Sequence, residues 1–79
     1  MAAVRDMKGT DEPTVVKVIE LIGSSPKSWE DAVANAVKEA AKTIHDIKAV
    51  YLKECTAKVE NARIVEYRSN VLISFVVNR

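Results

Sequence analysis

The fold is decided by residues 47–77, which read IKAVYLKECTAKVENARIVEYRSNVLISFVV. β-branched and aromatic residues recur along this stretch, and such residues are typical of strands. The stretch is interrupted at Asn61, within Glu60-Asn61-Ala62, and asparagine tolerates the left-handed backbone of a tight turn. We therefore predict a β-hairpin whose strands run from Ile47 to Glu60 and from Arg63 to Val77.

A period of two along each hairpin strand assigns its residues to two sides. In the second hairpin strand the inward side holds Val65, Tyr67, Ser69, Val71, Ile73, Phe75 and Val77. In the first, one side holds Ile47, Ala49, Tyr51, Lys53, Cys55, Ala57 and Val59, and the other is polar except at Val50 and Leu52. Glu54 and Arg68 then share the more polar side of adjacent strands, and they would attract each other if they stood opposite.

Upstream of the hairpin the sequence predicts one strand and one helix. The run Thr14 to Ile22 is rich in β-branched residues, and Gly23-Ser24-Ser25-Pro26 is expected to end it. Ser28 is a suitable N-cap, with Asp31 three residues later. A helix from Trp29 to Ile44 follows, because apolar residues recur at helical spacing; they are Trp29, Ala32, Val33, Ala36, Val37, Ala40, Ala41 and Ile44.

The predicted elements form an α+β domain of β-α-β-β order, with a three-stranded antiparallel sheet packed on one helix. A 14-residue strand reaches about 46 Å, whereas the predicted helix covers only about 24 Å. One helix cannot cover such a sheet. Other copies of the chain are therefore expected to cover the apolar sheet surface that remains.

Composition excludes several classes of protein. The 79-residue chain has one cysteine, hence no internal disulfide, and a net charge of +1, which argues against nucleic acid as a partner. It has no run of about 20 apolar residues to span a membrane. Residues 1–13 resemble no secretory signal; we expect them to be a flexible extension, residues 14–79 to be the single domain, and the protein to be cytoplasmic.

The sequence resembles the dodecin family from about residue 15 to residue 77. Residues 18–32, VIELIGSSPKSWEDA, look like the opening of dodecins. The similarity continues through Lys42-Thr43-Ile44, Leu52-Lys53-Glu54, Ile64-Val65-Glu66-Tyr67-Arg68 and Ser74-Phe75-Val76. The resemblance implies a hollow homododecamer in which flavins stack in pairs where protomers meet.

This chain departs from the flavin-binding dodecins at two positions. The family's stacking tryptophan aligns with Ala49, and its glutamine, which hydrogen-bonds the flavin ring, aligns with Arg68. Alanine offers no aromatic platform, and arginine suits a phosphate or a carboxylate better than a neutral ring edge. If flavin (FMN or riboflavin) binds, we expect Tyr51 to contact the ring and Arg68 to contact a polar or phosphate group. The backbone around Lys48, Ala49 and Val50 would then form the wall of the pocket.

Two functions remain open at this point. The first is a non-catalytic dodecameric protein that binds or stores flavin. The alternative is a dodecin-like shell that has lost flavin binding and either binds another ligand, a divalent cation or a nucleotide, or is purely structural. Tyr51 is also compatible with an ordinary packing role, and Glu54 and Arg68 with the lining of a pocket or pore.

The remaining candidate residues favour structural roles. We expect Trp29 to pack in the core, because it lies on the apolar side of the helix. His45 has no second His or Cys at ligand spacing, and Cys55 has no neighbour that would activate it, so neither predicts a metal or a catalytic site. No nucleophile with a base and no phosphate-binding glycine loop is present. We therefore predict that the protein is not an enzyme.

Overall fold

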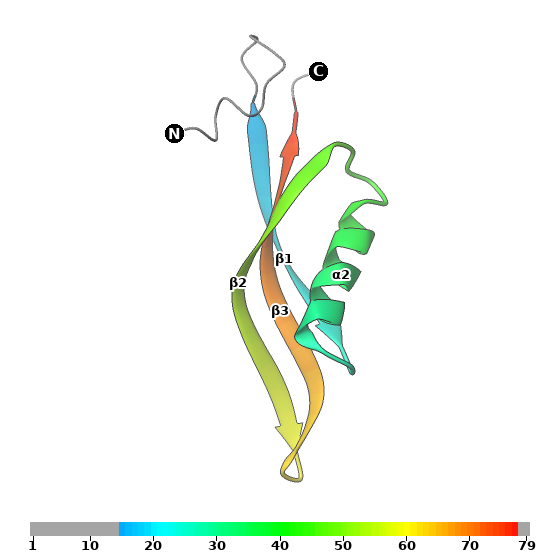
Figure 1. Ribbon diagram of the computed structural model, residues 1–79, viewed down its shortest axis with the longest axis vertical. Helices are drawn as coiled ribbons and strands as arrows, with labels where there is room; N and C mark the ends of the chain where they lie inside the picture. Colours follow the sequence, from blue (N-terminus) through cyan, green and yellow to red (C-terminus); the bar gives the residue numbers. More distant parts are fainter. Residues whose placement is uncertain (1–14, 78–79) are drawn as a thin grey trace.

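A computed structural model describes residues 15–77 and confirms the predicted α+β architecture. Its elements are β1 (Val16–Ser25), α2 (Trp29–Ala40), β2 (Ile47–Glu60) and β3 (Arg63–Val76). The strands form one antiparallel sheet in the order β1-β3-β2, with α2 along one face (Figure 1). The extension predicted for residues 1–13 lies outside the described residues.

The β2–β3 hairpin forms as predicted. β2 has the predicted bounds, and β3 ends one residue early, at Val76. Asn61 and Ala62 connect the strands with φ angles of 51° and 61°, so both have a left-handed backbone. A two-residue turn of this kind matches the right-handed twist of the strands that it joins.

β1 continues through the glycine that was expected to end it. The predicted strand, Thr14 to Ile22, is wrong at its C-terminal end, since β1 extends to Ser25; Thr14 lies outside the described residues. Gly23 lies beneath the helix, where an added Cβ would overlap the Ala32 carbonyl oxygen and lie 3.0 Å from the Ala36 Cβ. The glycine therefore allows α2 to pack close to β1.

The helix begins at the predicted residue and ends earlier than predicted. The Ser28 hydroxyl accepts a hydrogen bond from the Asp31 backbone N–H at 3.0 Å, which is the expected N-cap. α2 ends at Ala40 and not at Ile44, because the chain turns there to reach β2; the Ile44 N–H donates to the Ala40 carbonyl at 2.9 Å. Ile44 still packs against the core.

Two β-bulges in β2 change the face of the sheet on which the following side chains lie, compared with a simple alternation along the strand. The register shifts between Ile47 and Ala49 and between Leu52 and Glu54, so Lys48 and Lys53 are extra residues. We call the side of the sheet that α2 covers the helix face and the opposite side the outer face. The prediction that every second residue of β2 lies on the same side of the sheet along the whole strand was wrong. Val50, Leu52, Cys55 and Ala57 lie opposite helix-face residues of β3, whereas Ala49, Tyr51, Glu54 and Thr56 lie opposite outer-face residues.

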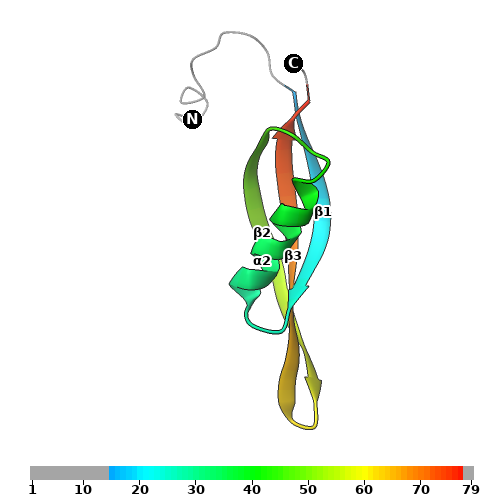
Figure 2. The same ribbon diagram turned by 90° about the vertical axis from the view of Figure 1, so that its right-hand side faces the viewer.

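The core is small and the protomer is elongated. Its buried apolar residues are Ala32, Ala36, Ala40, Val71 and Ile73. α2 packs mainly on β1 and β3 and leaves much of β2 uncovered (Figure 2). The longest dimension is 55 Å and the radius of gyration is 15.7 Å, whereas a compact chain of this length has about 11 Å. The fold therefore leaves much apolar surface exposed, as the strand and helix lengths predicted.

Candidate functional site: a helix groove and an outer sheet face

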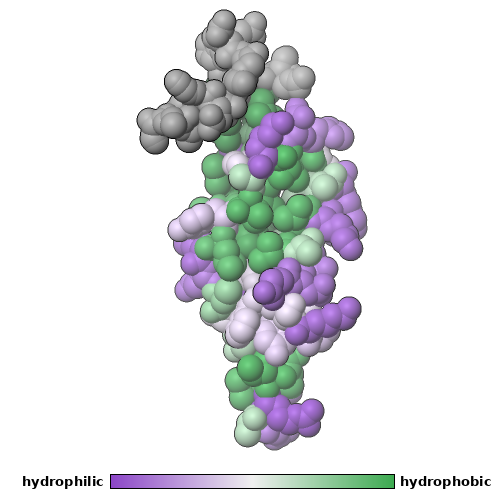
Figure 3. Space-filling view, viewed as in Figure 1, coloured by the Kyte–Doolittle hydropathy of each residue, from purple (hydrophilic) through white to green (hydrophobic). Residues whose placement is uncertain are grey.

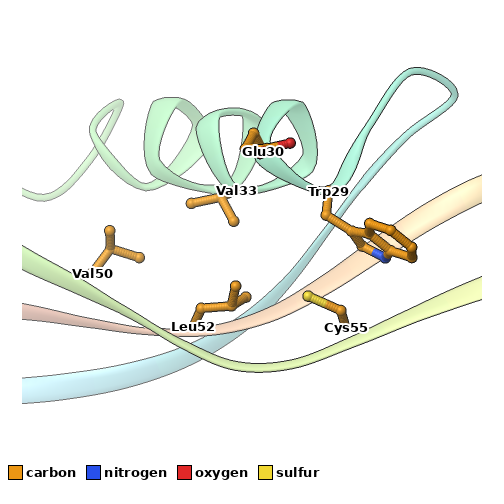
Figure 4. Close-up of a pocket in the computed structure, with 6 residues that line it drawn as sticks. All are labelled: Trp29, Glu30, Val33, Val50, Leu52 and Cys55. Carbon is orange, nitrogen blue, oxygen red and sulfur yellow. The ribbon is translucent and has the colours of Figure 1, made fainter.

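A groove lies between α2 and β2, and we call it the helix groove. Its volume is about 440 Å³, and it is lined by Trp29, Glu30, Val33, Val50, Leu52 and Cys55. Val33 projects from the helix toward Leu52 on the strand, and Trp29 and Cys55 lie at one end (Figure 4). Because the helix does not cover this part of β2, Leu52 remains 47% exposed. The groove was missed at the sequence level because the bulge at Lys53 brings Leu52 and Cys55 to the same face.

Trp29 forms the end wall of the groove and is not a core residue. Trp29 is 36% exposed, so the prediction of core packing was wrong. The indole N–H donates to the Thr56 carbonyl at 2.8 Å. The ring meets Tyr67 edge-on, with 4.9 Å between centroids and 82° between planes. Trp29 therefore ties the start of α2 to both hairpin strands.

Three of the five predicted flavin-contact residues lie together at the start of β2. Ala49 and Tyr51 lie on the outer face, opposite Ser74 and Leu72, and Lys48 is the bulge residue beside them. Tyr51 is 64% exposed and so is available for contact with a ligand or another copy. Val50 points to the helix groove, on the other side of the sheet.

Arg68 lies on the outer face but away from Tyr51 within one copy. It is four residues along β3 from Leu72, the partner of Tyr51, which corresponds to about 13 Å. Its guanidinium donates to the Glu66 carboxylate through Nε and Nη2, at 3.2 and 3.1 Å. The suggested Glu54–Arg68 pair does not form, because the register of the hairpin sets Glu54 opposite Asn70 and Arg68 opposite Thr56.

A second polar group, which we call the outer polar cluster, comprises Glu20, Lys53, Glu54 and Asn70. The Lys53 ammonium lies 3.1 Å from the Glu20 carboxylate. The Asn70 side chain and then Lys53 hold the pKa of Glu20 below its usual value of 4.5. The Asn70 Oδ1 atom is buried and has no hydrogen-bond partner in the described part of the chain. No periodicity indicates this cluster, because its lysine sits at a bulge.

One copy does not hold a complete metal site within residues 15–77. No group of three or more His, Cys, Asp or Glu residues is placed there to bind an ion. The outer polar cluster offers two carboxylates and one amide oxygen, whereas calcium takes six to eight oxygen ligands. A calcium site built on this cluster would need oxygen atoms from a second copy.

Within residues 15–77, no helix is long and apolar enough to cross a membrane.

Comparison with known proteins places the chain in one family. The sequence model of the family described as Dodecin matches residues 15–78. The calcium dodecin of Mycobacterium tuberculosis is 40% identical over 62 residues, which are 78% of this chain and 87% of that protein. Its crystal structure, described as calcium-chelating with a novel calcium-binding site, superposes with a TM-score of 0.73 at 39% identity, over 81% of this chain and 91% of that chain.

Two further solved structures share the fold. A point mutant of the Thermus thermophilus dodecin superposes with a TM-score of 0.81 at 27% identity, over 85% of this chain and all of that chain. The dodecin of Streptomyces davaonensis gives a TM-score of 0.82 at 18% identity, over 86% of this chain and all of that chain.

The element order and the open sheet faces define a class of small β-α-β-β proteins. The family match and the 40% identical relative make the assignment specific: the chain belongs to the dodecin family. Dodecins bind small ligands and form homo-oligomers, and they do not catalyse reactions. The predicted family, fold and absence of enzymatic activity are therefore confirmed.

Proposed function

We propose that this protein is a non-catalytic homododecamer that binds or stores a divalent cation, calcium in the first place. The observation that carries the proposal is Ala49. It lies on the outer face, and the sequence resemblance aligns it with the stacking tryptophan of flavin-binding dodecins, so the platform for a flavin sandwich is missing. A relative that is 40% identical is named calcium dodecin, which supports a cation as the ligand.

The outer polar cluster supplies the ligand chemistry that calcium prefers. Glu20 and Glu54 present hard carboxylate oxygen atoms on one face of the sheet, and the buried Asn70 Oδ1 atom lies between their strands on β3. Because one copy cannot complete the coordination shell, we place the site between copies. The Lys53 ammonium, 3.1 Å from Glu20, competes with a cation for that carboxylate. Its removal is therefore expected to strengthen calcium binding.

Calcium binding is tested by isothermal titration calorimetry of the chelator-treated protein. We expect saturable binding of calcium, tighter than that of magnesium, with a stoichiometry of one ion or fewer per chain. Glu54→Gln should weaken binding at least about tenfold, because a charged oxygen ligand is lost. Glu39→Gln, on the exposed side of α2, is the matched control and should bind as the wild type does. A titration that shows no heat of binding up to millimolar calcium would reject the cation as the ligand.

Flavin is the second candidate, and the exposure of Tyr51 favours it. Its ring lies on the outer face two residues from Ala49, on the same side of the strand. From there it can supply the aromatic surface that Ala49 lacks. The test is quenching of FMN and riboflavin fluorescence by micromolar protein. Quenching that Tyr51→Ala abolishes would support flavin, whereas a colourless protein that quenches neither compound would reject it.

A further inference from the structure

The Lys53 side chain crosses the sheet to reach Glu20. Lys53 belongs to β2 and Glu20 to β1, which are the edge strands of the sheet, and β3 lies between them. Even so, the Lys53 ammonium donates a hydrogen bond to the Glu20 carboxylate at 3.1 Å. Neighbouring strands are about 4.8 Å apart, so the two backbones are about 10 Å apart. The ion pair, which we call the strap, therefore spans the width of β3.

The bulge in β2 leaves Lys53 without a paired residue on β3. The residues before and after it, Leu52 and Glu54, are paired with consecutive residues of β3, so Lys53 is the extra residue. In an unbroken strand each side chain stands beside a cross-strand neighbour and packs against it. Lys53 has no such neighbour in β3, and its long side chain extends across the outer face instead.

Asn70 lies on β3 between the two ends of the strap. It is paired with Ile22 of β1 and with Glu54 of β2. A hydrogen bond from the Asn70 side chain lowers the pKa of Glu20, and since a carboxylate only accepts, the amide nitrogen is the donor. The amide oxygen, Oδ1, is buried and has no hydrogen-bond partner among residues 15–77. A buried polar atom without a partner is unfavourable, and a cation that reached this oxygen would satisfy it.

Apolar side chains border the strap on the outer face. Ile22, which is exposed, is paired with Asn70, and Leu72 is paired with Glu20. Figure 3 shows large apolar areas on the side of the molecule that it presents, with hydrophilic residues in separate groups around them. Apolar borders keep water and dissolved ions from screening a charge fully. The charge of a cation therefore strongly affects its attraction to the outer polar cluster.

We propose that Lys53 makes the outer polar cluster selective for divalent over monovalent cations. The Lys53 ammonium is itself a monovalent cation, and it reaches Glu20 without the translational freedom that a free ion loses on binding. Sodium or potassium has the same charge and therefore competes poorly with it. The attraction of a calcium ion to the same carboxylates is about twice as large. Lys53 then gives up Glu20 to calcium, and Asn70 offers Oδ1 as an added ligand. This inference rests on the proposed function, the binding of calcium, and adds the source of its selectivity.

Competition between sodium and calcium tests the proposal. Calcium is titrated calorimetrically into the chelator-treated protein, first in tetramethylammonium chloride and then in sodium chloride of the same concentration. Ionic strength is thereby fixed, and the methylated ion, unlike sodium, is too bulky for close coordination by carboxylates. The calcium Kd of the wild type should change by less than about twofold between the two salts. In Lys53→Met it should fall about fivefold in the first salt, because the ammonium no longer competes, and sodium should then raise it at least about threefold.

Lys58→Met and Lys53→Arg are the matched variants. The Lys58 ammonium lies 3.6 Å from the Glu60 carboxylate, outside the outer polar cluster. Its removal changes the net charge equally and should leave the response to sodium as in the wild type. Lys53→Arg keeps the positive charge and should keep the insensitivity to sodium.

The outcomes separate the selectivity proposal from the proposed function. If Lys53→Met binds calcium as the wild type does in both salts, the selectivity proposal is overturned and the calcium site stands. The same holds if sodium weakens binding to the wild type as much as to Lys53→Met. A wild type that binds no calcium in either salt overturns the proposed function as well.

The role of Asn70 is tested separately. Asn70→Leu removes Oδ1 with little change in volume and should raise the calcium Kd about fivefold or more, because a hard oxygen ligand is lost. Ser74→Ala, on the outer face further along β3, is the control and should bind calcium as the wild type does. If the Kd of Asn70→Leu equals that of the wild type, Oδ1 is not a ligand.

Discussion

Gly23 shows how one residue fixes the distance between helix and sheet. An alanine there would place its Cβ against the Ala32 carbonyl oxygen, and backbone cannot yield as a flexible side chain does. Gly23→Ala should lower the free energy of unfolding by about 1–3 kcal/mol. The measurement is urea unfolding at fixed protein concentration. Ser24→Ala, one residue further and exposed, should change stability by less than about 0.5 kcal/mol. Equal stability of the two variants would contradict the close packing.

Glu20 links stability to acid pH. Its pKa in the folded protein lies below 4.5, because the Asn70 side chain and Lys53 favour the carboxylate. A lowered pKa stabilises the folded state fully above the unfolded value, and this contribution is lost as the pH falls through the folded pKa. Carboxyl NMR titration should show the pKa of Glu20 rising toward 4.5 in Lys53→Met. In Glu20→Gln the unfolding midpoint should depend less on pH in this range, whereas an unchanged pH dependence would contradict the linkage.

At the scale of elements, the hairpin turn contains one residue that is poorly suited to its backbone. Ala62 has φ 61°, where a Cβ is unfavourable by about 1–2 kcal/mol. Ala62→Gly should therefore raise the free energy of unfolding by about 0.5–1 kcal/mol, after the greater flexibility of glycine in the unfolded chain is allowed for. The matched control, Ala57→Gly inside β2, should lower it by a similar amount. Destabilisation by both changes would argue against the left-handed turn.

The residues at which the helix and the strands begin were easier to predict from the sequence than the residues at which they end. The sheet face on which each side chain lies was also harder to predict. The Ser28 cap and the Asn61 turn are local signals, and both form as predicted. The apolar spacing continues to Ile44, but α2 ends at Ala40 because the chain must turn toward β2. A period of two cannot reveal a bulge, so the groove residue Leu52 and the position of Arg68 relative to Glu54 were not predictable.

For the whole molecule, the length argument correctly predicted that a single copy exposes much apolar surface. The radius of gyration of 15.7 Å and the small core agree with it. The ligand was less predictable, because its site depends on which residues of separate copies meet. Ala49 and Arg68 argue against a simple flavin sandwich but name no replacement. The cytoplasmic location and the lack of a nucleic-acid partner stay predictions.

The proposed assembly gives a definite mass. Twelve chains of 8.7 kDa have a mass of about 104 kDa. Size-exclusion chromatography with light scattering at micromolar concentration should show this species, and Leu52→Lys should dissociate it, because it places a charge in the helix groove. Lys42→Ala on the exposed side of the helix end is the control. A wild-type particle of one or two chains would contradict the dodecamer.

The two bulged lysines of β2 bear on how such a chain avoids growing without limit. β2 is an edge strand, and an unbroken edge invites hydrogen bonding with the next molecule, which ends in fibrils. Lys48 and Lys53 each interrupt that edge and add a charge to it. Association through strand edges is thereby disfavoured, and the apolar faces are left to direct it. A chain with much exposed apolar surface can in this way form a finite oligomer instead of an amyloid fibril.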